Sequence, residues 1–282
     1  MSFRLANQGG RAVLLSGGGV YDLERHTEGA FSSDPMAAIA RHAELHAVVG
    51  RLDAAEPDGA VDESSFGPPV PAPQKIFGIG LNYRDHAAES NLDVSEHPVV
   101  FGVFPSALTG PTGDIIVWGD TTDWEAELVV VIGTGGRDIT ADDAWSHVAG
   151  VTCGQDVSER AVQRRGNPAQ FSMGKSFDTH APIGPAVVSV DTLPDPDDLE
   201  LSCHVNGDRR QHARTSQMIF DVPALIAYLS SITTMVPGDL IFTGTPAGVG
   251  AASRTFLKPG DTVTTTIEAV GTMTNRCVAR PG

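Results

Sequence analysis

Short runs of β-branched and apolar residues, separated by Gly, Pro and Asp, make up most of the chain beyond residue 70. This pattern is typical of short strands joined by tight turns. It predicts strands at residues 75–79, 115–117, 127–132, 186–190, 199–205, 240–243 and 262–267. Helical spacing occurs between them at 141–147 and 222–230, without the regular rhythm of a βαβ protein. We therefore predict an α+β, β-rich fold built on a mixed sheet or β-roll.

The first 70 residues have a different pattern. Alternation over 11–21, around three consecutive glycines, predicts a hairpin, and residues 34–46 predict a helix that Asp34 caps, with Pro35 at its first position. A proline-rich run at 67–73 then predicts a stiff boundary. We expect a small N-terminal domain over residues 1–70, which supports packing or a dimer, and a larger domain over 71–282.

Charge and composition narrow the class of partner. The 282 residues carry a net charge of −16, which argues against nucleic acid and anionic membranes. The apolar runs are too short to cross a bilayer, and the N-terminus lacks the apolar centre of a signal peptide. Three cysteines without metal-binding spacing favour reduced thiols. These features predict a cytoplasmic protein whose anionic small-molecule partners are attracted by a local cationic site.

Three carboxylates are the most informative feature of the chain. Glu125 and Glu127 lie two residues apart at the start of an apolar strand, so both side chains project from the same face. Two adjacent anions repel each other, and a cation between them relieves the repulsion. Asp156 adds a third acid. Three carboxylate ligands suit Mg²⁺ or Mn²⁺ and leave positions for water and substrate, so the acids predict a catalytic metal site.

Other polar residues have two interpretations each. His86 and Glu89 share a helical face, either as a general-base pair or as an ordinary exposed pair. Asp156, Arg160 and Gln163 share the spacing of one helical face, where the Arg and Gln could contact substrate oxygens or solvent.

Lys175 lies in a turn-prone segment, where a surface charge is the default interpretation. The Gly-rich turn 244–250, which begins with Gly244 and Thr245, could bind an anion through its backbone N–H groups. It lacks the lysine and the spacing of a P-loop, which excludes nucleotide binding of that type.

Taken together and in this order, the motifs of residues 75–274 resemble the fumarylacetoacetate hydrolase superfamily. The motifs are Gly80–His86, Phe104–Pro111, Asp123–Gly133, Gln155–Arg160, Gly174–Asp178, Val205–Gly207, Met218–Phe220 and Pro237–Pro246.

The resemblance implies a mixed β-sandwich roll and a homodimer. It implies that the three acids bind Mg²⁺, Mn²⁺ or occasionally Ca²⁺, and that His86 and Glu89 form a lid dyad that activates water. It further implies substrate contacts, and a carbonyl-polarising role for Lys175. The implied substrate-binding residues are Tyr83, Arg160, Gln163, Lys175, Gly244 and Thr245.

The implied activity is hydrolysis of a C–C bond in a 2,4-dioxo acid such as an acylpyruvate, through an enolate that the metal stabilises. Degradation of aromatic compounds would be a natural pathway. An alternative with the same metal site is an enolate-forming decarboxylase, isomerase or lyase acting on oxaloacetate-like or 2-hydroxymuconate-like diacids. A third alternative is a metal-dependent acid-binding protein that has lost turnover.

Two details bear on substrate choice. Many relatives carry a lysine near the substrate or metal at the position of Val103. Losing one charge-assisted hydrogen bond would cost roughly 1.5–3 kcal/mol, so Val103 indicates a different substrate or weak activity. The stretch 90–97, just after the dyad, is expected to be a mobile lid.

Overall fold

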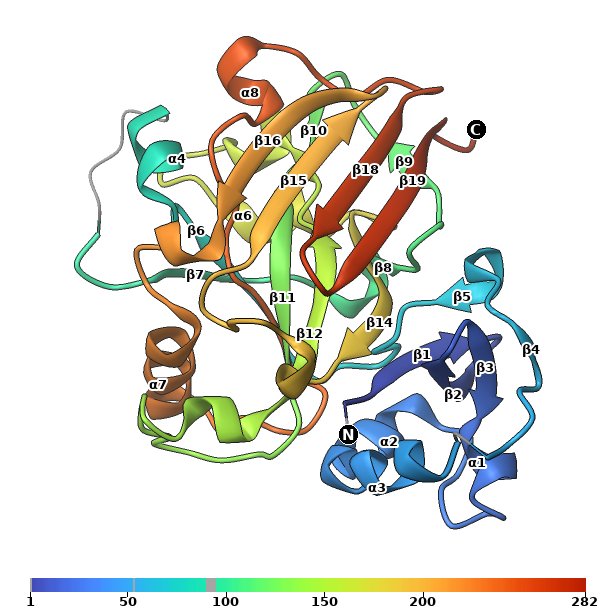
Figure 1. The fold of residues 1–282 in the computed structure, drawn as a ribbon. Helices are drawn as coiled ribbons and strands as arrows, with labels where there is room; N and C mark the ends of the chain where they lie inside the picture. Colours follow the sequence, from blue (N-terminus) through green and yellow to red (C-terminus); the bar gives the residue numbers. More distant parts are fainter. Residues whose placement is uncertain (1, 53, 90–94) are drawn as a thin grey trace.

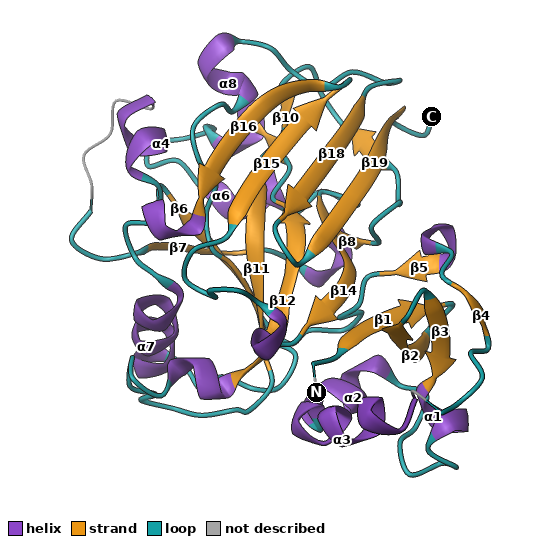
Figure 2. Cartoon of the chain, in the orientation of Figure 1, coloured by secondary structure: helices purple, strands orange, loops and turns teal. Residues whose placement is uncertain are grey.

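The computed structural model describes residues 2–52, 54–89 and 95–282, and within them the fold is β-rich with short helices (Figures 1 and 2). The largest sheet is mixed and has the order β4-β3-β2-β1-β14-β12-β11-β17-β6-β7, with β5 pairing β1 and β8 pairing β14. Its strands are β1 (Arg4–Gln8), β2 (Arg11–Ser16), β3 (Gly19–Asp22), β4 (Gly59–Ala60), β5 (Phe66–Gly67), β6 (Ile76–Gly80), β7 (Val99–Gly102), β8 (Leu108–Thr109), β11 (Ala126–Ile132), β12 (Val148–Gln155), β14 (Ala181–Val188) and β17 (Leu240–Phe242).

A second sheet of five strands packs against β11 and β12 (Figure 1). Its order is β16-β15-β18-β19-β9, from strands β9 (Ile115–Val117), β15 (Glu200–Val205), β16 (Asp208–Arg214), β18 (Thr262–Ile267) and β19 (Gly271–Ala279). A short pair joins β10 (Thr122–Asp123) and β13 (Ser158–Glu159). The two packed layers confirm the predicted mixed β-roll.

The helices are short and lie around the sheets (Figure 2). They are α1 (Leu23–His26), α2 (Pro35–Ala40), α3 (His42–Leu52), α4 (Arg84–Glu89), α5 (Arg160–Gln163), α6 (Phe171–Lys175), α7 (Val222–Ile232) and α8 (Gly250–Ser253). Among the described residues, none of these is both long and apolar enough to span a membrane.

β11 occupies the centre of the fold because both of its faces are apolar and buried. Leu128, Val130 and Ile132 pack into the core beneath the five-stranded sheet. Val129 and Val131 pack on the opposite side with Leu5 and Leu14 of the N-terminal segment, as well as with side chains of the larger sheet. Seven consecutive buried residues explain why the run shows no polar alternation.

The N-terminal segment joins the larger sheet directly. Leu5 of β1 pairs with Val187 of β14 in an antiparallel ladder, so hydrogen bonding continues from β1 into the central strands. The predicted hairpin is confirmed as β2 and β3, joined by Gly17 and Gly18, which both have positive φ. The boundary at residue 70 stays a prediction.

Two helix predictions need correction. The helix predicted at 34–46 begins as expected, with Asp34 accepting from the Met36 amide and Pro35 in the first turn, but Arg41 separates it into α2 and α3. The helix predicted at 141–147 is only a 3-10 helix over Ala144–His147. In both cases the apolar spacing is helical, and the local backbone breaks the continuous hydrogen bonding.

Candidate active site and metal centre

The three predicted acids lie together and are buried. Glu127 is the second residue of β11, Glu125 directly precedes this strand, and Asp156 follows the end of β12. The antiparallel register places Glu127 opposite Gly154, and the Asp156 amide donates to the Glu125 carbonyl at 2.9 Å. One carboxylate oxygen from each acid lies within 4.8 Å of the others. Pairing of neighbouring strands therefore assembles the cluster that the sequence predicted.

Two buried cations contact the cluster. Lys175 Nζ lies 2.6 Å from Glu125 Oε2 and 2.7 Å from Asp156 Oδ2. Arg160 lies 2.7 Å from Glu125 Oε1 and 2.8 Å from Asp123 Oδ2. Lys175 is only 2% exposed, so it is not the surface charge that its turn-prone surroundings suggested. Buried charges are stable only when they are paired, and these pairs meet that condition.

Asp123 is a structural partner that sequence reasoning did not assign. Its carboxylate accepts from the backbone amides of Gly250 and Ala251 at 2.6 and 2.9 Å, and it also pairs with Arg160. Asp123 thereby connects the start of α8 to the arginine beside the acid cluster. Its place in the run Asp123–Gly133 was visible in the sequence, but its two amide partners lie 127 and 128 residues away along the chain.

Burial and mutual repulsion affect the three acids differently. Burial raises the pKa of Glu127 well above its ordinary value, and the charges of Asp156 and Glu125 raise it further. Burial also raises the pKa of Asp156 to about 6, although Lys175 opposes the change. For Glu125, Lys175 and Arg160 outweigh burial and lower the pKa to about 2. Glu127 is thus the least compensated of the three acids.

The donor atoms fit a hard divalent cation. Asp156 Oδ1 is buried without a hydrogen-bond partner among the described residues, and so is Tyr83 Oη. Buried polar atoms are normally paired, so two unpaired oxygens here indicate a ligand or water. Burial and the charge of Glu127 raise the pKa of Tyr83, so its hydroxyl keeps its proton and can donate to bound water. An all-oxygen set suits Mg²⁺ or Mn²⁺.

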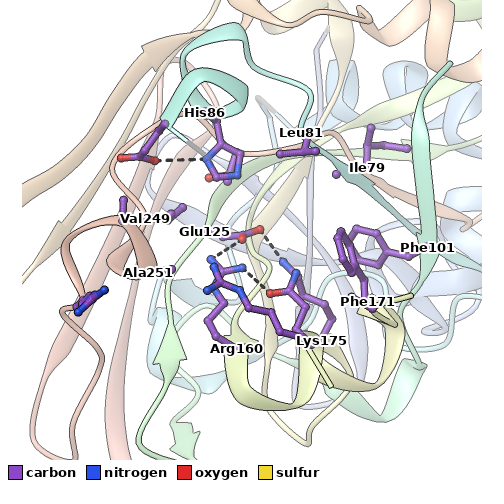
Figure 3. Close-up of a pocket in the computed structure, with 18 residues that line it drawn as sticks. Ile79, Leu81, His86, Phe101, Glu125, Arg160, Phe171, Lys175, Val249 and Ala251 are labelled. Atoms are coloured by element: carbon purple, nitrogen blue, oxygen red, sulfur yellow. Dashed lines mark hydrogen bonds and ion pairs between the residues drawn. The ribbon is translucent and has the colours of Figure 1, made fainter. Parts of the chain in front are cut away.

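The predicted dyad lies on α4, with His86 Nδ1 3.5 Å from Glu89 Oε2 (Figure 3). Both oxygens of Glu89 also accept from the Gly248 amide at 3.2 Å. The contact with Gly248 connects α4 to the loop after β17 and holds the carboxylate that orients the imidazole. In Figure 3, His86 and Glu125 lie on facing sides of the pocket.

A cavity of about 650 Å³ is lined by both residues of the dyad and by Glu125 of the acid cluster. His86, Glu89, Glu125, Arg160, Gln163, Lys175 and Thr245 are among the residues that line it. The apolar part of the cavity wall is formed by Ile79, Leu81, Phe101, Phe171 and Val249. This combination of an apolar wall with a few convergent polar groups is typical of a small-molecule site.

Two of the predicted substrate residues line the cavity, and a third contacts a predicted metal ligand. Gln163 lines the cavity and accepts from Arg160 Nη1 at 2.9 Å. Thr245 also lines it, donating to the Ala126 carbonyl at 2.8 Å. The Gly244 amide, in contrast, donates to Glu127 Oε2 at 2.7 Å and is therefore already used by a predicted metal ligand.

Some expectations about placement are not met. Asp156 precedes β13 and is not on one helix with Arg160 and Gln163, because α5 begins only at Arg160. Tyr83 is fully buried and is not part of the cavity wall. Val103 is also buried, packing in the apolar core after β7 and away from the cavity wall. Most of the predicted lid, residues 90–94, lies outside the described residues.

Comparison with known proteins places this geometry in one family. A family model for the fumarylacetoacetate (FAA) hydrolase C-terminal domain matches residues 75–278. Mitochondrial oxaloacetate tautomerases from Bos taurus and Homo sapiens are each 44% identical over 220 residues, covering 77% of this chain and 70% of each relative.

Solved structures extend the similarity to the whole chain. A Mycobacterium smegmatis protein provisionally assigned as HpcE matches with a TM-score of 0.92 and 47% identity, covering 99% of this chain and 100% of that one. Maleylpyruvate hydrolase from Sphingobium sp. SYK-6, in complex with manganese(II) and pyruvate, matches with a TM-score of 0.81 and 31% identity. The match to the hydrolase covers 99% of this chain and 100% of that chain.

Proposed function

Because this chain belongs to the fumarylacetoacetate hydrolase family, we propose that it is a divalent-metal-dependent enzyme that interconverts the keto and enol forms of oxaloacetate or a similar 2-oxo diacid. One observation carries the proposal: a His–Glu dyad lines the same cavity as Glu125, which is one of three buried, clustered carboxylates. The 44% identity to oxaloacetate tautomerases supports this reaction over the C–C hydrolysis expected first from the sequence.

Glu125, Glu127 and Asp156 would hold the cation, which supplies positive charge beside the oxygens of the substrate. Lys175 and Arg160 add fixed positive charge at the same end of the cavity, where they can bind a substrate carboxylate.

His86 is the residue placed to move the proton. In tautomerisation, a proton leaves C3 of the keto acid and a proton is added to the oxygen on C2, so a single acid–base group suffices. Glu89 lies beside Nδ1, which leaves Nε2 for the substrate and stabilises the imidazolium formed in between. Arg160, which is charged at all relevant pH values, cannot replace His86 in this role.

Hydrolysis of an acylpyruvate is the second candidate. The structural neighbour that is a maleylpyruvate hydrolase was solved with manganese and pyruvate. A cavity of about 650 Å³ also has room for acids longer than oxaloacetate. In this reaction, His86 would take a proton from water.

The test follows the ultraviolet absorbance of enol-oxaloacetate and of an acylpyruvate panel. We expect Mn²⁺ or Mg²⁺ to accelerate loss of the enol without release of CO₂, and chelation to abolish the acceleration. His86→Asn should lower the rate roughly 10²- to 10⁴-fold, while His212→Asn, at an exposed histidine of β16, should not. Pyruvate release from an acylpyruvate, with no effect on oxaloacetate, would replace the tautomerase by the hydrolase.

A further inference from the structure

Two arginines outside the acid cluster line the same cavity. Arg164 follows α5 and Arg254 follows α8, and both are exposed, unlike the buried Arg160 and Lys175. The cavity therefore has cationic groups in two settings: a buried pair in contact with the acids, and an exposed pair apart from them. A monocarboxylic 2-oxo acid would use only the first.

Neither exposed arginine forms an ion pair within the described part of the chain. The arginines that form ion pairs among the described residues are Arg11, Arg25, Arg41, Arg137, Arg160, Arg210 and Arg214. The chain has 35 acidic residues and 19 Lys and Arg, so its net charge is negative. Two guanidinium groups without an ion pair at one cavity therefore create a local positive potential on a negatively charged protein. Such a potential attracts an anion and is free to bind it.

The backbone holds Arg254 in a defined position. It lies in the left-handed region, with φ 56° and ψ 34°, directly after α8. The Thr255 amide closes the turn on the Gly250 carbonyl at 2.9 Å, and Asp123 accepts from the amides of Gly250 and Ala251. Asp123 also pairs with Arg160. One carboxylate therefore connects the start of α8, the helix that Arg254 follows, to the arginine at the acid cluster.

The wall of the cavity suits a short carbon chain. Leu81, Phe101 and Phe171 line it together with the charged groups. A carbon chain can therefore lie against apolar side chains while its ends meet polar ones. A volume of about 650 Å³ allows acids longer than four carbons.

We propose that Arg254, assisted by Arg164, binds the second carboxylate of a dicarboxylic 2-oxo acid whose first carboxylate and 2-oxo group lie at the acid cluster. Arg254 is then the residue that selects diacids over monoacids. The inference rests on the proposed function for the position of the 2-oxo end. It adds the residue that recognises the second carboxylate, for 2-oxo diacids of about four to six carbons.

The test measures binding of matched acids to the full chain with Mn²⁺ by titration calorimetry. 2-Oxoglutarate and 2-oxopentanoate have equal chain lengths and differ only in a terminal carboxylate, and 2-oxoadipate and 2-oxohexanoate form a longer pair. We expect the diacid of at least one pair to bind about ten- to a hundredfold more tightly, the value of one charge-assisted contact. Arg254→Gln should remove most of that preference, and Arg254→Lys should restore part of it.

Arg165→Gln is the matched control, because Arg165 is exposed and adjacent to Arg164 but does not line the cavity. It should leave the preference unchanged. If the monoacids bind equally well to the wild type and to Arg254→Gln while the diacid preference persists in that variant, Arg254 is not the selecting residue and the proposed function stands. If the wild type shows no preference in either pair, the inference also fails. If no 2-oxo acid binds with Mn²⁺, the proposed function fails and the inference fails with it.

Discussion

Glu127 carries a buried charge with little compensation. Lys175 and Arg160 both contact Glu125, and Lys175 also contacts Asp156. Among the described residues, the Gly244 amide is the only hydrogen-bond donor to Glu127. A neutral group of the same shape should therefore be better tolerated there than the carboxylate when no cation is bound. Replacing a metal ligand by a neutral group should therefore not destabilise the metal-free protein, whereas replacing a residue that stabilises the fold should.

We predict that Glu127→Gln is at least as stable as the wild type in chelator at pH 8, yet gains little from Mn²⁺. The reason is that burial and neighbouring acids raise the pKa of Glu127, so its ionisation costs folding free energy that glutamine avoids. Thermal unfolding with EDTA and with Mn²⁺ measures both effects. Glu96→Gln, at an exposed acid, is the control. A large Mn²⁺ stabilisation of Glu127→Gln would show that Glu127 is not a ligand.

The metal-free stability should also depend on pH through Asp156. Its pKa of about 6 in the folded state lies above its ordinary value of 3.8, so the folded state keeps the proton longer than the unfolded state. A raised folded pKa contributes stability that is present below about pH 4 and is lost as the pH rises through 6. A cation competes with that proton for the same carboxylate.

We therefore predict that the rise in unfolding temperature caused by saturating Mn²⁺ is small at pH 5 and grows up to pH 7.5. Differential scanning fluorimetry at constant ionic strength across this range measures it. Asp156→Asn should weaken the pH dependence and remove most of the Mn²⁺ effect. A constant Mn²⁺ effect from pH 5 to 7.5 would contradict a metal site that includes Asp156.

At the scale of elements, the sequence predicted those features that depend on neighbouring residues. The buried strand after Glu127 is confirmed as β11, and β18 has the predicted bounds of Thr262–Ile267. Alternation on one strand was enough to put Glu125 and Glu127 together. The long-range partners were out of reach, because Gly248 and Glu89 are 159 residues apart and their contact depends on the packing of α4 against a distant loop.

The contact between Glu89 and Gly248 gives a test at this scale. Glu89→Gln keeps the size of the side chain but weakens its hold on His86 and on the Gly248 amide. We expect kcat to fall about ten- to a hundredfold, because the imidazolium loses its stabilising charge. Mn²⁺ stabilisation should stay at the wild-type level, since Glu89 is not among the clustered acids. An equal loss of Mn²⁺ stabilisation would show that the contact supports the metal site itself.

At the scale of the whole molecule, the N-terminal segment supports the strand that carries the site. β1 extends the larger sheet through β14, and Phe3, Leu5 and Leu14 pack in the same core as Val129 and Val131 of β11. These valines alternate with Leu128 and Val130, so β11 needs cover on both faces. The segment therefore takes part in one continuous core despite the proline-rich stretch that follows it.

This shared core predicts the outcome of removing the segment. A chain of residues 71–282 would expose Val129, Val131 and Val187 together with a new free edge on β14. Each large apolar side chain that loses its packing costs on the order of 2–5 kcal/mol, and total domain stabilities are about 5–15 kcal/mol. An exposed strand edge also promotes association between chains. We expect the truncated chain to aggregate, or to unfold well below the full chain in thermal scans, and to lose Mn²⁺ stabilisation because β11 is no longer held. A soluble, cooperatively unfolding 71–282 chain that retains the full Mn²⁺ effect would instead establish an independent catalytic domain with its boundary near residue 70.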